Sequence, residues 1–166
     1  WDGEDRLCDM HHRVLGAEDT PYNRSVVQYL MTALAGRCLS PGIKADMVPV
    51  LVGPQGCRKS TFIEKLAPIP DTYVDLDLST RDDNLSRQLI GRLVVESGEL
   101  RGYGARDQES LKAWITRTAE EWIPKWKEHR QEYPRRFVLV GSTNNRRFLV
   151  DPTGARRWLP MTVCQT

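Results

Sequence analysis

Short apolar runs alternate with helical patterns along most of this chain. The runs with the length and composition of buried strands are 47–52, 73–77, 92–96, 137–142 and 157–161. Helical segments separate these runs, and strands that alternate with helices are typical of a parallel sheet. We therefore predict a three-layer α/β fold in which helices cover a central, mostly parallel sheet.

The chain before this alternation has a helical pattern. Thr20 and Pro21 favour a helix start, because a hydroxyl caps free backbone N–H groups and proline suits the first helical position. An apolar face at period 3.6 follows, and it consists of Val26, Val27, Tyr29, Leu30, Ala33 and Leu34. We predict an N-terminal helical segment at 1–46 and an α/β core at 47–166, together forming one compact domain.

Two more helices are predicted between the later strands. Residues 80–83 open the first with the spacing of a capping box, and this helix runs to about Ile90. The second is a long polar helix at 107–130. Its apolar positions are Leu111, Trp114, Ile115, Trp122 and Trp126.

The first predicted strand leads into a glycine-rich loop. Residues 53–61, Gly-Pro-Gln-Gly-Cys-Arg-Lys-Ser-Thr, resemble the phosphate-binding P-loop, G-x-x-x-x-G-K-[ST], and the strand before and helix after are the context that this motif requires. In such a loop the backbone N–H groups cradle phosphates, Lys59 contacts the outer phosphates and the Ser60 hydroxyl is a ligand of Mg²⁺. The candidate ATP-binding residues are Gly53, Pro54, Gln55, Gly56, Cys57, Arg58, Lys59, Ser60 and Thr61.

The loop departs from the motif at one position. Arg58 stands where the P-loop has its second glycine, directly before the lysine. Glycine allows the backbone to approach the phosphates closely and to adopt a conformation that a Cβ opposes. Arg58 therefore either crowds the phosphate site and slows hydrolysis, or adds a charged ligand for the phosphates.

The third predicted strand ends in two carboxylates, Glu96 and Glu99. Parallel sheets bind ligands at the edge where their strands end, and a P-loop also lies there. A P-loop enzyme needs one carboxylate near Mg²⁺ and another that orients or deprotonates the attacking water. We expect Ser60 and Glu96 to hold the metal and both glutamates to act in catalysis. Solvated loop acids are the alternative.

Two later segments add polar candidates. Asn144 follows the fourth strand, where it could contact the γ-phosphate or the attacking water; an ordinary turn asparagine is the alternative. Arg156 and Arg157 suit an arginine finger, which stabilises charge on a transferring phosphoryl group. A basic rim around a nucleotide or nucleic-acid groove would use the same arginines.

The composition says more about the cellular compartment of the protein than about its function. The 166 residues carry a formal net charge of +2, which permits nucleic-acid binding without arguing for it. The four cysteines are far apart in the sequence and form no C-x-x-C pair, so we expect no zinc site and reduced thiols in the cytoplasm. No apolar segment is long enough to span a membrane. The chain begins at Trp1, and we expect it to be a piece of a longer protein.

Together these motifs resemble the virulence-associated protein E family, phage and mobile-element ATPases whose core is similar to the superfamily 3 helicases within the AAA+ group. The resemblance covers nearly the whole chain. Its motifs are a lead-in at 1–3 and 15–22, a Walker A loop at 53–62, a Walker B region at 91–100, a sensor strand at 141–144 and a closing signature at 148–160.

The resemblance implies an ATP- and Mg²⁺-dependent motor domain of a replicative helicase. The residues that carry its roles are Lys59 and Ser60 for phosphate and Mg²⁺, Glu96 and Glu99 as Walker B carboxylates, Asn144 as the sensor, and Arg156 or Arg157 as a finger into a neighbouring subunit. The expected partners are single-stranded nucleic acid, with DNA favoured, and further copies of the chain in a ring, for which a hexamer is one form.

Three functions remain open from the residues alone. For a nucleic-acid-stimulated motor, a strand-binding channel would be lined by Lys112, Arg117, Lys125, Lys127, Arg130, Arg135 and Arg136, interleaved with Trp114, Trp122 and Trp126. Core tryptophans and a solvated charged face would give the same pattern. The second function is a nucleotide- or nucleic-acid-binding module with weak or no turnover because of Arg58. The third is a small-molecule kinase, which would need a lid and an acceptor pocket.

Overall fold

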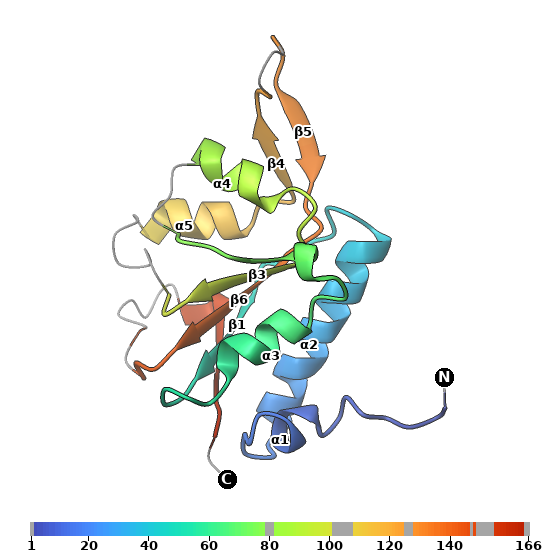
Figure 1. Cartoon of the computed structure of the whole chain (residues 1–166), viewed down its shortest axis with the longest axis vertical. Helices are drawn as coiled ribbons and strands as arrows, with labels where there is room; N and C mark the ends of the chain where they lie inside the picture. Colours follow the sequence, from blue (N-terminus) through green and yellow to red (C-terminus); the bar gives the residue numbers. More distant parts are fainter. Residues whose placement is uncertain are drawn as a thin grey trace.

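The core of the computed structural model is a five-stranded parallel sheet (Figure 1). The structure describes residues 2–78, 82–100, 108–124, 128–146, 148 and 155–164. The strands are β1 (Val48–Val52), β2 (Tyr73–Asp75), β3 (Val94–Gly98), β6 (Val138–Thr143) and β7 (Trp158–Thr162), in the spatial order β2-β3-β6-β1-β7. Each of these strands begins and ends within two residues of the bounds predicted for it, and all four pairings between them are parallel. The predicted parallel sheet is therefore confirmed.

Helices cover both faces of this sheet (Figure 1). On one face lie α2 (Pro21–Leu39) and α3 (Lys59–Lys65), and their side chains share an apolar cluster with Leu51 of β1. On the other face lie α4 (Asp82–Leu89) and α5 (Gln108–Ile115), which pack in a second cluster with Val50 of the same strand. Neighbouring strand residues point to opposite faces, so the two clusters alternate along β1 and produce the predicted three layers.

The N-terminal part is helical from residue 10 onward, apart from a short connection. α1 (Met10–Arg13) is a single turn, and residues 2–9 contain no helix. The predicted cap of the next helix is confirmed, because the Thr20 hydroxyl accepts a hydrogen bond from the backbone N–H of Asn23 at 3.2 Å. Within α2, the Tyr29 hydroxyl donates to the carbonyl oxygen of Met47 at 3.1 Å and thereby joins the helix to the start of β1.

The long helix predicted at 107–130 is confirmed at its start, as α5, and is wrong beyond Ile115. After α5 the chain forms β4 (Ala119–Trp122) and β5 (Gln131–Pro134), an antiparallel hairpin that projects from the body (Figure 1). Trp122 stacks on Tyr133 across the hairpin, with ring centroids 4.0 Å apart. Residues four apart share a face in a strand as well as in a helix, which is why this tryptophan pattern suited the wrong element. Trp126 lies outside the described residues.

The remaining connections are short. Three-residue 3-10 helices lie at Pro70–Thr72 and Ala155–Arg157. α4 coincides with the helix predicted up to Ile90, whose predicted cap Thr80 lies outside the described residues. In the part of the chain that the structure describes, no helix has the length and apolar character needed to cross a bilayer.

Candidate functional site

The glycine-rich loop leaves the carboxyl end of β1 and turns directly into α3, so the strand–loop–helix context predicted for it is confirmed. Gly53 packs against the segment after β7, where an added Cβ would lie 2.8 Å from the Cγ2 atom of Val163. Gly56 has a φ of +89°, which glycine adopts without steric cost. The loop therefore needs glycine at the first position for close packing and at the fourth for its backbone conformation.

Arg58 adopts a left-handed backbone conformation, with φ of 52° and ψ of 30°. This is the kind of conformation that a Cβ opposes, and for an L-residue it costs about 1–2 kcal/mol. The arginine side chain is exposed and lines the same cavity as Lys59 and Ser60. Arg58 thus occupies a backbone shape suited to the glycine it replaces, at a cost in stability.

Lys59 bends back across the loop. Its side chain is buried, and its Nζ atom donates to the carbonyl oxygens of Gly53 at 2.8 Å and Pro54 at 2.9 Å. An ammonium group has three N–H donors. Two of them hold the lysine in place against the loop, and the third is left for an anion bound in the cavity.

Glu96, in β3, is a buried carboxylate surrounded by hydroxyl groups. It is 1% exposed. Its Oε1 atom accepts hydrogen bonds from the hydroxyls of Ser60 and Ser142, and its Oε2 atom accepts one from the hydroxyl of Tyr73, each at 2.6 Å. Among the described residues, no lysine, arginine or histidine forms an ion pair with it. A buried carboxylate without a cation is costly, and a bound cation would remove that cost.

The contact between Ser60 and Glu96 joins two predicted metal ligands, whereas sequence reasoning missed Ser142 and Tyr73. Both lie on strands that neighbour β3, namely β6 and β2. A polar residue at the end of an apolar strand was an available signal for Ser142, but Tyr73 is an ordinary strand aromatic that nothing marked. Burial, and then the hydrogen bond to Glu96, raises the pKa of Tyr73, so its hydroxyl stays protonated and donates.

Glu99 and Asn144 meet at the rim of the same sheet edge. The backbone N–H of Asn144 donates to the Oε2 atom of Glu99 at 3.3 Å. Glu99 and Leu100 have positive φ angles of 52° and 47°, and non-glycine residues in this conformation cluster at functional sites. Between the loop, Glu99 and Ser142 lies a cavity of about 280 Å³, slightly below the range of about 300–1,000 Å³ that is usual for small-molecule sites.

The residues at this edge fit a magnesium ion that arrives with a nucleotide. Mg²⁺ prefers oxygen ligands, and proteins usually hold it with one or two carboxylates together with substrate phosphates. The Glu96 carboxylate and the Ser60 hydroxyl supply such oxygens side by side. No group of three or more His, Cys, Asp or Glu side chains gathers in the part of the chain that the structure describes. A shell completed by phosphate and water is therefore the form that this edge could hold.

Arg156 and Arg157 lie at the amino ends of the parallel strands, whereas the glycine-rich loop lies at their carboxyl ends. They belong to the 3-10 helix that precedes β7, and β7 runs parallel to β1, so the arginines are at the amino end of the strands while the glycine-rich loop is at the carboxyl end. Strands of this length place the two roughly 15 Å apart. The arginines line a separate cavity of about 410 Å³ together with Lys112 and Glu109 of α5. The structure brings the other predicted site residues together without them.

Cys57 and Cys164 form a disulfide, in contrast to the expected reduced thiols. The two cysteines are 107 positions apart in the sequence, but β1 and β7 are parallel neighbours that end at the same edge. Their Cα atoms are 6.1 Å apart, within the usual range for a disulfide. Strand pairing creates this proximity, which is why sequence spacing did not indicate it. The bond attaches the glycine-rich loop to the segment that follows β7.

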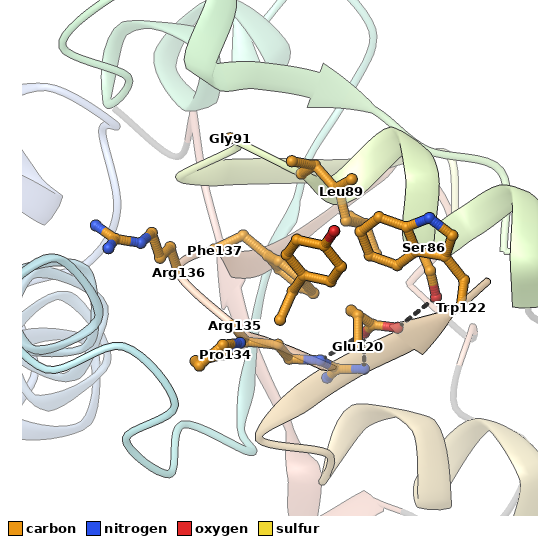
Figure 2. A pocket seen from close by; sticks show the side chains of 11 residues that line it. Ser86, Leu89, Gly91, Glu120, Trp122, Pro134, Arg135, Arg136 and Phe137 are labelled. Atoms are coloured by element: carbon orange, nitrogen blue, oxygen red, sulfur yellow. Dashed lines mark hydrogen bonds and ion pairs between the residues drawn. The ribbon is translucent and has the colours of Figure 1, made fainter. Parts of the chain in front are cut away.

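A third cavity, of about 280 Å³, lies at the base of the β4–β5 hairpin beside α4 (Figure 2). It is lined by a buried ion pair between Glu120 and Arg135, in which Arg135 Nε donates to Glu120 Oε1 at 2.6 Å. The Ser86 hydroxyl donates to the other carboxylate oxygen at 2.8 Å. Burial lowers the pKa of Arg135 to about 10, although Glu120 opposes this shift. Arg135, a predicted strand-binding cation, is therefore part of the folded core.

The other residues of the predicted strand-binding channel divide into buried and exposed groups. Trp114 and Trp122 are 1% and 5% exposed, so they belong to the core, as in the alternative interpretation. Arg130 is exposed near the end of the hairpin and forms an ion pair with Glu121. Residues 125–127, with both hairpin lysines, lie outside the described residues.

Three solved structures, each an apo form of the NrS-1 C-terminal region, are similar to this chain in fold. Their TM-scores are 0.61, 0.63 and 0.63, with sequence identities of 15%, 14% and 15%. The matches cover 95%, 95% and 96% of this chain but only 36%, 38% and 38% of the solved chains, so this chain spans little more than a third of their length. At these identities the likeness shows a shared fold and nothing further.

The sequence was also compared with curated proteins and with the profiles of protein families. No curated protein matches the sequence. The profile of the virulence-associated protein E-like domain, in contrast, matches residues 1–166. The match includes the glycine-rich loop, the acidic end of β3 and the arginines before β7. This chain therefore belongs to the family of virulence-associated protein E-like domains.

Proposed function

We propose that this chain binds Mg²⁺-ATP at the glycine-rich loop and hydrolyses it, as a P-loop NTPase. One observation carries the proposal: a lysine ammonium with a donor that no described residue uses and a serine hydroxyl line one cavity, and that hydroxyl donates to a buried carboxylate that forms no ion pair among the described residues. Lys59 suits the outer phosphates, whereas Ser60 and Glu96 suit the metal. The chain leaves β1 toward β2 and leaves β6 in the other direction toward β7, and open parallel sheets bind ligands at such a switch point.

The rim residues suit the hydrolytic step. A bound Mg²⁺ would neutralise part of the phosphate charge. Glu99 is exposed, and among the described residues its hydrogen bond from Asn144 uses the Oε2 atom, so its other oxygen would orient an attacking water and accept its proton. The Asn144 side chain would donate a hydrogen bond to that water or to the γ-phosphate. These roles favour hydrolysis over transfer to a metabolite, because they serve water as the acceptor.

Lys59→Ala tests nucleotide binding directly. The variant loses the ammonium that would contact the outer phosphates, so we expect ATP affinity to fall by at least about tenfold in the presence of Mg²⁺, measured by calorimetry. Lys65→Ala removes an exposed lysine from the other end of α3 and is the matched control, with unchanged affinity. If Lys59→Ala binds ATP as tightly as the wild type, the nucleotide site is assigned wrongly.

A nucleotide-binding module without turnover is the second candidate, because Arg58 holds a left-handed conformation inside the loop. Glycine adopts this conformation freely, so Arg58→Gly should relieve about 1–2 kcal/mol of strain. If the arginine crowds the phosphates, the variant hydrolyses ATP faster and binds it no less tightly. If the arginine is a phosphate ligand, affinity falls instead. A variant equal to the wild type in both quantities would exclude a role for Arg58 at the phosphates.

We propose that the arginines complete the site of a neighbouring copy in a ring. Their position at the opposite edge of the sheet keeps them from the loop of their own chain. A chain with Lys59→Ala can donate arginines but lacks a site, and a chain with Arg156→Ala and Arg157→Ala has a site but no donor. Mixing the two inactive proteins should restore part of the wild-type ATPase rate. An inactive mixture in which mixed oligomers demonstrably form would make the arginines structural or nucleic-acid contacts.

We further propose that the β4–β5 hairpin contacts single-stranded DNA, as part of a cytoplasmic helicase motor for phage or mobile-element replication. The family resemblance supports the role, and the hairpin sequence supplies Lys125, Lys127 and Arg130 around Trp126. Replacing Lys125 and Lys127 with alanine should weaken DNA binding and flatten its dependence on salt. The control is Lys44→Ala, an exposed lysine before β1. If the variant without Lys125 and Lys127 binds DNA as tightly as the Lys44→Ala control, the nucleic acid binds elsewhere on the protein.

A further inference from the structure

Tyr73 holds the oxygen of Glu96 that Ser60 does not contact. Its hydroxyl donates to Oε2 at 2.6 Å, whereas Oε1 accepts from Ser60 and Ser142. Strand pairing creates this contact: Tyr73 lies opposite Val94, and Glu96 is the next residue of β3 on the same face. Such diagonal neighbours are within reach of an aromatic side chain.

The ring of Tyr73 and its hydroxyl have separate roles. The ring is partly buried against the apolar cluster that contains Ile63 and Val94. The hydroxyl extends beyond this packing to the carboxylate of Glu96. Phenylalanine would keep the packing and remove the hydrogen bond alone, so the two roles can be tested independently.

A carboxylate at the end of a glutamate side chain turns easily, because its terminal torsion is broad. The Tyr73 hydroxyl restricts that torsion from one side, while the serine hydroxyls contact the other oxygen. Groups that orient a metal-binding carboxylate in this way typically change metal affinity by about 10- to 100-fold when they are lost. The geometry around Glu96 has the same form.

We propose that Tyr73 is a positioning residue that sets the Glu96 carboxylate for Mg²⁺. By holding Oε2, it keeps Oε1 beside the Ser60 hydroxyl. The Oε1 atom and the Ser60 oxygen are then both in place before a nucleotide arrives. The inference rests on the proposed function of this site, namely binding of Mg²⁺-ATP. It assigns to β2, one of the two edge strands of the parallel sheet, a part in the site that no sequence motif marks.

The test compares ATP affinity with Mg²⁺ and with a chelator in the wild type and in Tyr73→Phe, by calorimetry. We expect the affinity gained from Mg²⁺ to fall by about tenfold in the variant, and the affinity in chelator to stay the same. Combining Tyr73→Phe with Glu96→Gln should add little to the loss caused by Glu96→Gln alone, because the tyrosine acts through that carboxylate.

Tyr29→Phe is the matched control. Tyr29 is also a partly buried tyrosine that packs against the same cluster, but its hydroxyl contacts the backbone of Met47. The control should lower the free energy of unfolding and leave the Mg²⁺ dependence unaltered. If the wild type gains affinity from Mg²⁺ and Tyr73→Phe gains as much, the positioning role is overturned while the nucleotide site stands. A wild type that binds no ATP with or without Mg²⁺ would overturn the proposed function as well.

Discussion

Two buried glutamates of this chain have opposite electrostatic surroundings. Glu96 and Glu120 are 1% and 3% exposed, and each accepts hydrogen bonds on both carboxylate oxygens. Glu120, in the hairpin, is neutralised by Arg135 (Figure 2), whereas among the described residues Glu96 accepts side-chain hydrogen bonds from hydroxyl groups and forms no ion pair. The comparison teaches that burial alone does not mark a site. The presence or absence of a paired cation does mark it. The charge of Glu96 remains available for a bound ligand, whereas the charge of Glu120 is already balanced by Arg135.

The largest expected effect belongs to the paired glutamate. Glu120→Gln would leave the Arg135 guanidinium buried without its counter-charge, and breaking a buried pair in this way costs about 3–5 kcal/mol of unfolding free energy. Urea denaturation measures this loss. At temperatures where the variant is folded, its Mg²⁺-dependent ATP affinity should equal that of the wild type. A loss below about 1 kcal/mol would mean that the ion pair contributes little to the fold.

Removing the charge of the unpaired glutamate should act on binding instead. Glu96→Gln keeps the shape of the side chain and an oxygen acceptor for the hydroxyls, so the free energy of unfolding should stay equal or rise. The affinity for ATP that depends on Mg²⁺ should fall by about a hundredfold or more, since loss of supporting groups alone costs 10- to 100-fold. Calorimetry with and without Mg²⁺ provides the measurement. Unchanged Mg²⁺ dependence would show that Glu96 is not the metal carboxylate.

The serines beside the two glutamates permit a smaller, matched comparison. Ser86 donates to Glu120 and Ser142 donates to Glu96. Replacing either with alanine removes one hydrogen bond to a buried charge and should cost about 1–3 kcal/mol of stability. Only Ser142→Ala should also weaken Mg²⁺-dependent ATP binding. If both variants, or neither, change that binding, the two carboxylates do not differ in the way proposed.

The smallest effect is expected at an exposed carboxylate that has a cation. The hydrogen bond from Arg24, and then the contact with His11, lowers the pKa of Asp19 to about 2. A lowered pKa means that the folded state favours the charged form, so the contribution of Asp19 is present above about pH 4 and is lost as the pH falls toward 2. The difference in thermal midpoint between wild type and Asp19→Asn should shrink between pH 4 and pH 2. A constant difference would contradict this pKa.

Sequence alone predicted the parts of the fold that depend on local pattern. Each strand of the parallel sheet was an apolar run, and the rule that parallel strands end at one edge placed Glu96 near Ser60. The rule did not predict contacts that depend on which strands lie next to each other in the sheet. The order β2-β3-β6-β1-β7 brings Tyr73 to Glu96 and Cys57 to Cys164, and no periodicity carries that order. The hairpin was missed because its tryptophan spacing also suits a helix.

The disulfide between Cys57 and Cys164 closes a covalent ring of chain. β2, β3, β6 and β7 lie within the ring, together with the hairpin, while α2 and β1 lie outside it. A protease that cuts the chain once inside the ring, for instance in the hairpin, therefore yields two polypeptides that remain one molecule. They separate only after a reductant opens the bond. Gel migration of the nicked protein with and without reductant thus reports the state of a bond that begins in the glycine-rich loop.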